Sequence, residues 1–328
     1  MVERIIRAIG HSLAAPTLLP EPGDDAAIFA VDSQNQWIIS TDWFLEGIHF
    51  LPSIHPPDSI GFKALARAAS DLAAMGAAPR FFLMALALPP SRSRTWLDQM
   101  LAGMRRASCR FRLQLAGGDT TRYSSLALNI TVIGTVNPGR AISRANARPG
   151  HLLYVSGALG GAQLGLQLLR AGASRASPGA KSLLRPHLYP EPRLALGQWL
   201  ASKQLASAMI DVSDGLSTDL HNLCRASGVG AQVRRAAIPC VNLSPGLRKQ
   251  DLDPLRLALH GGDDYELLFT IPRRFAHHIP AKFHGLPLTA IGEITKSKRI
   301  LLLHQDGHTT PLAPSGWDSF MKTKWARR

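Results

Sequence analysis

Acidic residues are scarce in this sequence. It has 23 Asp and Glu against 37 Lys and Arg, which gives a formal net charge of +14. Such a balance suits either a nucleic-acid binder or an enzyme that acts on anionic substrates. The basic residues are scattered, and aromatic residues make up only 6% of the chain, so no basic block interleaved with aromatic residues is present. We therefore do not expect nucleic acid as a partner.

Cysteines and long apolar runs are also few. Cys109, Cys224 and Cys240 show no C-x-x-C spacing, which gives neither a disulfide framework nor a zinc signature and favours a reducing cytosol. The densest apolar run, residues 81–91, is too short to span a bilayer. The N-terminus contains Glu3 and lacks the apolar segment of a secretory signal. We expect a cytoplasmic protein without a membrane-spanning segment.

The length and the order of the patterns predict two domains. A chain of 328 residues with 45% hydrophobic residues can bury a sizeable core. Strand and helix patterns alternate in both halves, which predicts an α/β or α+β fold. The stretch from Asn137 to Gly150 is poor in large apolar residues and rich in turn formers. We therefore predict an N-terminal domain over 1–137, a linker over 138–149 and a C-terminal domain over 150–328.

Apolar periodicity predicts the individual elements of both halves. In the first half it predicts strands over 26–32, 36–42, 81–88, 113–118 and 125–136, and helices over 56–77 and 94–108. In the second half it predicts strands at 152–157, 230–239, 266–272, 288–294 and 300–306, and helices that end near 170, cover 193–201 and lie near 273–278. The segment 207–216 is predicted to form a strand, a turn and the start of a helix. The polar, Pro- and Ser-rich stretch 171–190 is predicted to be a linker.

Common nucleotide-binding and catalytic motifs are missing from the sequence. It contains no G-x-x-x-x-G-K-[ST], G-x-S-x-G or H-E-x-x-H. The segment SGALGGAQLG at 156–165 follows a strand and opens a helix, but it lacks the G-x-G-x-x-G spacing. We interpret it as a tight turn with close helix packing.

Many of the few acids lie where surface acids normally do not. They follow apolar strands, adjoin glycines or interrupt apolar helices, and they are Asp24, Asp25, Asp42, Asp71, Asp119, Asp211, Asp214, Asp263 and Asp264. A buried carboxylate must be paired, hydrogen-bonded or bound to a metal. Few basic residues adjoin these acids in the sequence, so metal is the simplest explanation, and oxygen ligands suit Mg²⁺ or Mn²⁺.

The acids differ in how readily a capping role explains them. Helix caps and turns account for isolated acids in general, and such a role is predicted for Asp58, Asp98, Asp251 and Asp253. Asp71 lies inside an Ala-rich helical stretch, so no cap explains it. Several such sites in one chain predict a multi-metal phosphate site. That chemistry points to phosphoryl transfer between two polyanions, in which an acceptor phosphate needs no general base.

Six motifs resemble those of one enzyme family in order and spacing. They are GDDAA, STDWFLEGIHF, KALARAASDLAAMGAAP, LAGGDTTR, IDVSDGLSTDL and GGDDYELLF. Together they resemble the thiamine-monophosphate kinase family, within the superfamily of aminoimidazole ribonucleotide synthetase, over about residues 23–317. The resemblance implies γ-phosphoryl transfer from ATP to thiamine monophosphate. It also implies an N-terminal sheet that forms the dimer and the ATP site, and a C-terminal α/β domain.

The resemblance also implies roles for individual residues. The magnesium ligands would be Asp25, Ser40, Thr41, Asp42, Asp71, Asp119, Asp211 and Asp214. The nucleotide contacts would be Gly118, Asp119, Arg144 and Ser213, and the thiamine phosphate would face His49, Asp263 and Trp317. The family usually has Glu where this chain has Asp263, so that contact is shorter by one methylene. His151 replaces the usual Asp of KPGD, and Pro22 enters the usual GIGDD, without removing an implied metal ligand.

Other functions remain as alternatives. A selenophosphate synthetase usually carries a Cys or selenocysteine near the N-terminus, and the first cysteine here is Cys109. A hydrogenase-maturation relative would need a C-terminal Cys, and this chain ends KTKWARR. Another ATP-dependent synthetase of the superfamily is the first alternative, and a basic nucleic-acid-binding protein is the second.

The segment AMIDVSDGLSTDL at 208–220 combines three aspartates with no Lys or Arg. We expect a strand to deliver Asp211 to the site, Ser213 to cap the following helix, and Asp214 to lie in its first turn. Asp219 is offset from the face of Asp214, so we assign it either a structural role or a role in supporting the metal ligands from behind. The positive charge at this place is expected to come from magnesium and not from the protein.

Overall fold

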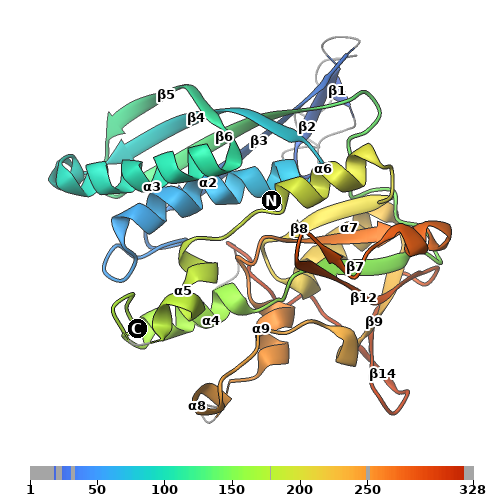
Figure 1. Cartoon of the computed structure of the whole chain (residues 1–328). Coiled ribbons are helices and arrows are strands. Elements are labelled where there is room, and N and C mark those ends of the chain that lie inside the picture. Colours follow the sequence, from blue (N-terminus) through green and yellow to red (C-terminus); the bar gives the residue numbers. More distant parts are fainter. Residues whose placement is uncertain (1–17, 20–23, 31–33, 178, 249–251, 321–328) are drawn as a thin grey trace.

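The computed structural model describes residues 18–19, 24–30, 34–177, 179–248 and 252–320. Two sheets and a layer of helices between them make up most of the described chain (Figure 1). The three cysteines are all free. Among the described residues, no helix combines the length and the apolar character needed to cross a membrane.

The first sheet is built from the N-terminal part of the chain. Its strand order is β1 (Leu18–Leu19), β2 (Ala27–Ala30), β3 (Gln36–Leu45), β6 (Ala127–Val136), β4 (Ala78–Leu88) and β5 (Gln114–Arg122). Neighbouring strands are antiparallel except β4 and β5, which are parallel. Helices α2 (Pro57–Ala74) and α3 (Thr95–Phe111) cover one face of this sheet (Figure 1).

Strand β3 shows how the sequence assigns the two faces of the sheet. Successive side chains of a strand point to opposite faces. Ile38 and Phe44 are buried in the core beneath α2, whereas Trp43 is 56% exposed. Ser40 and Asp42 share the parity of Ile38, so they face α2.

Helix α2 joins the two halves of the molecule. It starts at Pro57, where proline suits the first helical position, and it ends before Gly76, which has a positive φ of 71°. Most of its residues are buried, and its last turn packs against the C-terminal strands. Gly197 of α6 (Leu194–Ser202) approaches it so closely that a Cβ there would lie 2.0 Å from the Ala73 carbonyl oxygen.

The second sheet is built from the C-terminal part of the chain. Its order is β14 (Thr309–Pro311), β13 (Ile300–Leu303), β9 (Gly230–Arg234), β12 (Leu286–Thr295), β7 (Leu152–Ser156), β10 (Glu266–Ile271) and β8 (Ala208–Val212), with β11 (Lys282–Phe283) paired to β12. Helices α7 (Leu216–Ser227) and α9 (Pro254–His260) pack on one face, and α6 with the end of α2 packs on the other.

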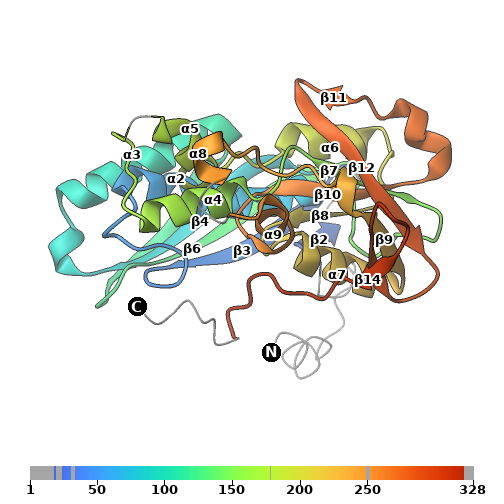
Figure 2. The same ribbon diagram turned by 90° about the horizontal axis from the view of Figure 1, so that it is seen from below.

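The remaining helices lie beside this sheet. They are α4 (Gly161–Arg170), α5 (Ala180–Leu188) and the short α8 (Pro245–Arg248), with 3₁₀ turns at Pro90–Arg92, Arg235–Ala237 and Arg273–His278. Seen from below, α4 and α9 lie in front of the N-terminal strands (Figure 2). The prediction of a linker over 171–190 is wrong for α5, which forms because Leu184 and Leu188 bury against Leu169 of α4.

Candidate active site

Three aspartates from distant parts of the chain meet between the two sheets. Carboxylate oxygens of Asp25, Asp71 and Asp211 all lie within 4.8 Å of one another. Asp25 precedes β2, Asp71 lies in the last turns of α2, and Asp211 lies on β8. We call these three residues the acidic cluster.

Protein donors only partly satisfy the acidic cluster. The Ser40 hydroxyl donates to Asp71 at 2.5 Å, and the Ser70 hydroxyl donates to Asp211 at 2.6 Å. The Oδ2 atom of Asp25 is buried and has no hydrogen-bond partner among the residues that the structure describes. A buried oxygen without a partner is costly, so this atom fits a ligand such as a divalent cation.

The electrostatics of the cluster are those of carboxylates that lack sufficient positive charge. Burial raises the pKa of Asp25 to about 8, against the opposing charge of Arg144 and with support from Asp211. Burial and the neighbouring Asp42 raise the pKa of Asp71 well above its usual value. Burial also raises the pKa of Asp211. An oxygen-only ligand set of this kind fits Mg²⁺.

Asp214 follows Asp211 in the turn before α7. Burial and the charge of Asp211 raise its pKa to about 7. The prediction that Ser213 caps the helix is wrong, because its hydroxyl lies 3.5 Å from Asp211 and the helix begins only at Leu216. Asp219 acts there instead, since its Oδ2 accepts hydrogen bonds from the backbone N–H groups of Asp214 and Gly215 at 3.0 Å each. The predicted structural role of Asp219 is confirmed.

Arg144 lies in the segment between β6 and β7, and its side chain contacts the acidic cluster. Its guanidinium donates a short hydrogen bond to Asp25 and lies 3.3 Å from the carboxylate of Asp24. Asp24 also accepts from the Ser143 hydroxyl at 2.5 Å and from the Arg144 backbone N–H. The structure thus places Arg144, predicted to contact nucleotide, beside the predicted metal ligands.

Helix α2 supplies two further cations that the sequence interpretation missed. Lys63, Arg67 and Asp71 are spaced four residues apart, so their side chains share one face of the helix. The Arg67 guanidinium lies 3.7 Å from the carboxylate of Asp42. The expectation that the protein supplies no positive charge near these aspartates is therefore wrong. The i, i+4 spacing of charged residues on an otherwise apolar helix was the signal that could have revealed them.

Asp263 lies in a cationic pocket at the other end of this face. Its carboxylate accepts hydrogen bonds from Lys63 at 2.8 Å and from the Tyr265 hydroxyl at 2.7 Å, and Arg67 lies 3.6 Å away. Burial opposes its ionisation, but the charges of Lys63 and Arg67 outweigh burial and hold the pKa of Asp263 well below its usual range. We call Asp263, Lys63, Tyr265 and His187 the Asp263 pocket.

A chain of hydrogen bonds extends this pocket into the protein. The Lys63 ammonium lies 3.2 Å from Nδ1 of His187, whose Nε2 lies 2.9 Å from Nε2 of His55. An ammonium can only donate, so His187 accepts at Nδ1 and donates from Nε2 to His55. The Nδ1 atom of His55 lies 3.0 Å from the carbonyl oxygen and 3.1 Å from the backbone nitrogen of Leu51, so the ring is held against the Leu51 backbone. The chain fixes Lys63 against Asp263.

His49 and Trp317 lie near these groups. The Nδ1 atom of His49 accepts from the Leu45 backbone N–H at 2.9 Å, so the ring donates through Nε2. Burial and the charge of Arg67 lower the pKa of His49 to about 4, which keeps it neutral. The backbone N–H of Trp317 donates to the Asp214 carbonyl oxygen at 2.9 Å, and the indole is 36% exposed.

Thr41 and Asp119 do not join the acidic cluster. The Thr41 hydroxyl is on the exposed face of β3, where it hydrogen-bonds Asn129 and Thr131. Asp119 is exposed on β5, and its carboxylate accepts from the Thr120 backbone N–H. At Gly118 a Cβ would lie 1.9 Å from the Met84 carbonyl oxygen, so sheet packing alone requires glycine there.

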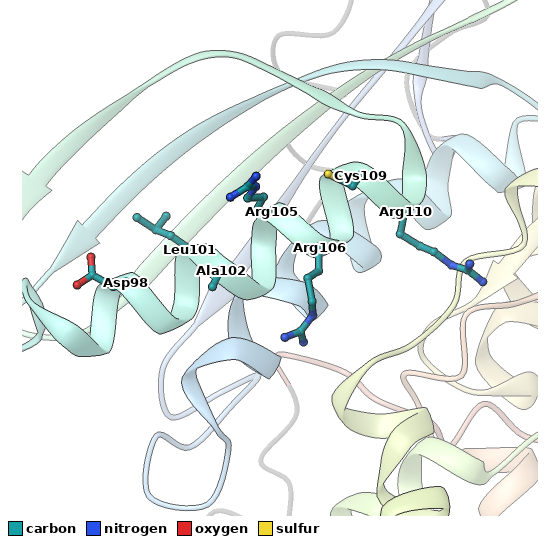
Figure 3. A pocket seen from close by; sticks show the side chains of 7 residues that line it. All are labelled: Asp98, Leu101, Ala102, Arg105, Arg106, Cys109 and Arg110. Atoms are coloured by element: carbon teal, nitrogen blue, oxygen red, sulfur yellow. The ribbon is translucent and has the colours of Figure 1, made fainter.

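A shallow hollow along α3 is separate from this site. It is lined by Asp98, Leu101, Ala102, Arg105, Arg106, Cys109 and Arg110 (Figure 3). Arg106 pairs with Asp58 and Arg110 pairs with Glu191. Asp58 lies in the first turn of α2 and its carboxylate pairs with Arg106, so its predicted capping role is wrong, whereas Asp253 caps α9 as predicted.

Comparison with known proteins agrees with this architecture. The family model of the AIR synthase related protein N-terminal domain matches residues 23–136, and that of the C-terminal domain matches residues 148–304. The thiamine-monophosphate kinase of Escherichia coli strain K12 is 39% identical over 304 residues, which cover 91% of each chain. The chain belongs to the thiamine-monophosphate kinase family.

Solved structures of this family superpose over almost the whole chain. The thiamine-monophosphate kinase of Stenotrophomonas maltophilia K279a has a TM-score of 0.75 at 36% identity, and covers 94% of this chain and 96% of its own. The structure of AaThiL complexed with AMPPCP and TMP has a TM-score of 0.84 at 28% identity, with 97% and 96% covered. The predicted family and the predicted two-part fold of mixed α and β elements are confirmed.

Proposed function

We propose that this protein transfers the γ-phosphoryl group of ATP to thiamine monophosphate and forms thiamine diphosphate. The relatives named thiamine-monophosphate kinase, and the AaThiL structure that holds AMPPCP and TMP, support this activity. The observation in this chain that supports it most is the acidic cluster, whose three carboxylates meet within 4.8 Å and have raised pKa values.

We propose that magnesium ions occupy the acidic cluster and its surroundings. The ligands would be Asp25, Ser40, Asp42, Asp71, Asp211 and Asp214, with Thr41 and Asp119 contributing from the outer side of the sheet. Bound magnesium would neutralise the phosphate charges of both substrates, so that two polyanions can approach each other. The orphan Oδ2 atom of Asp25 fits this role.

The chain's own residues would hold the substrates in line. Arg144 and Ser213, with Gly118 and Asp119, would contact the nucleotide, whereas His49, Asp263 and Trp317 would face thiamine monophosphate. An oxygen of the acceptor phosphate attacks Pγ while the bond to the β–γ bridging oxygen breaks, and ADP leaves. The acceptor oxygen is already ionised, so no general base is required. A neutral His49 donating from Nε2 suits contact with an anionic oxygen.

We further propose that the protein works in the cytoplasm as a homodimer joined through the outer face of the first sheet. Trp43 and Leu83 are 56% and 38% exposed, which is unusual for large apolar side chains on one face of a sheet. Thr41 and Leu83 are both register partners of Thr131, so they lie on the same face of the sheet. Asp119 is the partner of Ala85, which is two residues from Leu83, so Asp119 also lies on this face. The second copy would enclose them.

A direct assay tests the activity. Purified protein with ATP, Mg²⁺ and thiamine monophosphate should form thiamine diphosphate and ADP in equal amounts, without release of free phosphate. Asp42→Ala should lower the rate by about 10²- to 10³-fold because an electrostatic ligand is lost. Asp98→Ala, on the exposed side of α3, serves as the matched control. A parent protein that forms no thiamine diphosphate would refute the proposed substrate.

The dimer has a separate test. Trp43→Arg should convert the protein to a monomer in light scattering, because it places charge at the centre of the apolar face. Tyr123→Arg is a useful comparison, since Tyr123 is 58% exposed beyond the end of β5. A monomeric parent protein at micromolar concentration would refute the proposed assembly.

A further inference from the structure

Arg67 has hydrogen-bond donors that the described protein does not use. Its Nε atom is buried and has no hydrogen-bond partner in the described part of the chain, and its side chain is only 16% exposed. Within the ranges that the structure describes, its guanidinium makes ion pairs at 3.6 and 3.7 Å but no hydrogen bond. Charge-assisted hydrogen bonds are about 2.7–2.9 Å long, so these distances leave the donors free.

Two other partly buried arginines, Arg193 and Arg92, each make two hydrogen bonds to one carboxylate, whereas Arg144, whose Nε also lacks a hydrogen-bond partner among the described residues, donates to Asp25 from its terminal nitrogen. Arg193 donates from Nε and Nη2 to both carboxylate oxygens of Glu266. Arg92 donates from both terminal nitrogens to Glu46 at 2.5 and 2.9 Å. These arginines are structural because their partners are within the protein. A buried guanidinium without such partners indicates a binding role, because desolvated donors are costly unless something accepts from them.

The position of Arg67 indicates which ligand it would bind. It lies between Asp42, a proposed magnesium ligand, and Asp263, a proposed substrate contact. Its guanidinium lies 5.5 Å from the centre of the Phe44 ring, on which His49 also stacks. Arg67 therefore occupies the boundary between the metal end and the substrate end of the site. In a reaction between two phosphates, the acceptor phosphate must reach this boundary.

We propose that Arg67 binds the phosphate group of thiamine monophosphate through its free guanidinium donors. The inference rests on the proposed function. A guanidinium presents five N–H donors in a planar fork that matches phosphate oxygens, and it stays charged throughout the physiological range. The carbon atom of the guanidinium lies over the Phe44 ring, and Lys63 already pairs with Asp263, so the guanidinium donors are available. Arg67 thus adds a protein cation to the charge that magnesium would supply.

Binding measurements on Arg67 variants test this proposal. Titration calorimetry would compare the parent protein, Arg67→Ala and Arg67→Lys, with thiamine monophosphate as ligand in the presence of Mg²⁺ and AMPPCP. We expect Arg67→Ala to weaken thiamine monophosphate binding by about tenfold to a hundredfold, which is typical of a lost charged hydrogen bond. Arg67→Lys should recover part of this loss because it keeps the charge but not the fork. Binding of AMPPCP with Mg²⁺ should change less than about threefold.

The controls separate this proposal from a structural role and from the proposed function. Arg193→Lys should lower the melting temperature without a selective loss of thiamine monophosphate affinity. A thiamine monophosphate affinity within threefold of the parent in both Arg67 variants would overturn the proposal, and so would an equal loss of affinity for AMPPCP. In either case the parent protein would still form thiamine diphosphate. Only its inactivity would count against the proposed function.

Discussion

The acidic cluster and the Asp263 pocket lie at the two ends of one face of α2, and they differ in how their negative charge is balanced. The acidic cluster contains Asp71 on the helix, and its pKa values are raised. The Asp263 pocket is built around Lys63, two helical turns earlier, and the pKa of Asp263 is lowered. Burial is a strong influence at both ends, so burial alone does not explain the difference.

The source of positive charge explains it. Asp263 has an ammonium at 2.8 Å and a guanidinium at 3.6 Å, so its negative charge is balanced within the folded chain. The acidic cluster has hydroxyl donors and one arginine for three carboxylates. The charge of the Asp263 pocket is therefore balanced as the protein folds, whereas the charge of the acidic cluster is balanced only when the cluster binds cations. Carboxylates with strongly shifted pKa values are typical of functional sites, and here the two ends differ in whether a protein cation or a bound cation balances them.

Replacing Asp71 by Asn should have the largest effect. The change removes a proposed metal ligand but keeps an oxygen for the Ser40 hydroxyl. We expect activity to fall by about 10³-fold, because magnesium stabilises the transition state by several kcal/mol. The melting temperature of the metal-free protein should rise, since one buried charge disappears. A variant that loses stability without magnesium would show that the cluster is not short of positive charge.

Lys63→Met should have the opposite effect on stability. It removes the ammonium and leaves the Asp263 carboxylate with the Tyr265 hydroxyl and with the charge of Arg67 at 3.6 Å, so the free energy of unfolding should fall by about 3–5 kcal/mol. Urea denaturation without metal measures this change. The double variant Lys63→Met with Asp263→Asn should recover much of the loss. If Lys63→Met were as stable as the parent, Lys63 would not balance the charge of Asp263, and the proposed difference between the Asp263 pocket and the acidic cluster would be refuted.

Magnesium binding should strengthen as the pH rises from 6 to 8. The pKa values of Asp25 and Asp214 are about 8 and about 7, so these groups hold protons near neutrality that a cation must displace. Each displaced proton changes the affinity by up to about tenfold per pH unit. The metal-free protein should lose stability over the same interval, because its folded state binds more protons than its unfolded state. Calorimetry and thermal melting at pH 6, 7 and 8 test both trends.

Asp219→Asn should have the smallest effect. Asp219 accepts from two backbone N–H groups through one oxygen, and burial with the charge of Asp214 raises its pKa well above its usual value. An amide oxygen can accept the same bonds without charge. We expect the free energy of unfolding to change by about 1 kcal/mol or less and the activity to remain within a few-fold. A loss comparable to that of Asp71→Asn would place Asp219 among the ligands.

The sequence predicted the acidic residues of the site better than its basic ones. Asp71 was identifiable because no cap explains an aspartate inside an Ala-rich helix, and Asp211 because it ends an apolar strand. Lys63 and Arg67 were overlooked because lysine and arginine within a helix are ordinary on a solvated surface. Their burial became apparent only when α2 lay between two sheets. Thr41 was grouped with Ser40 and Asp42 by adjacency, although the period of the strand places its hydroxyl on the opposite face.

The sequence by itself determined the family, the alternating strands and helices, and the set of carboxylates available for chemistry. Those features are local or follow from patterns that repeat along the chain. The tertiary structure decided which carboxylates meet in the acidic cluster, where the protein supplies too little positive charge, and which carboxylate is paired with a protein cation. Charge balance is a property of distances in space: Asp263 lies 200 residues from Lys63 in the sequence and 2.8 Å from it in the fold. Coulomb energy and desolvation depend on those distances and on burial, and not on the order of residues along the chain.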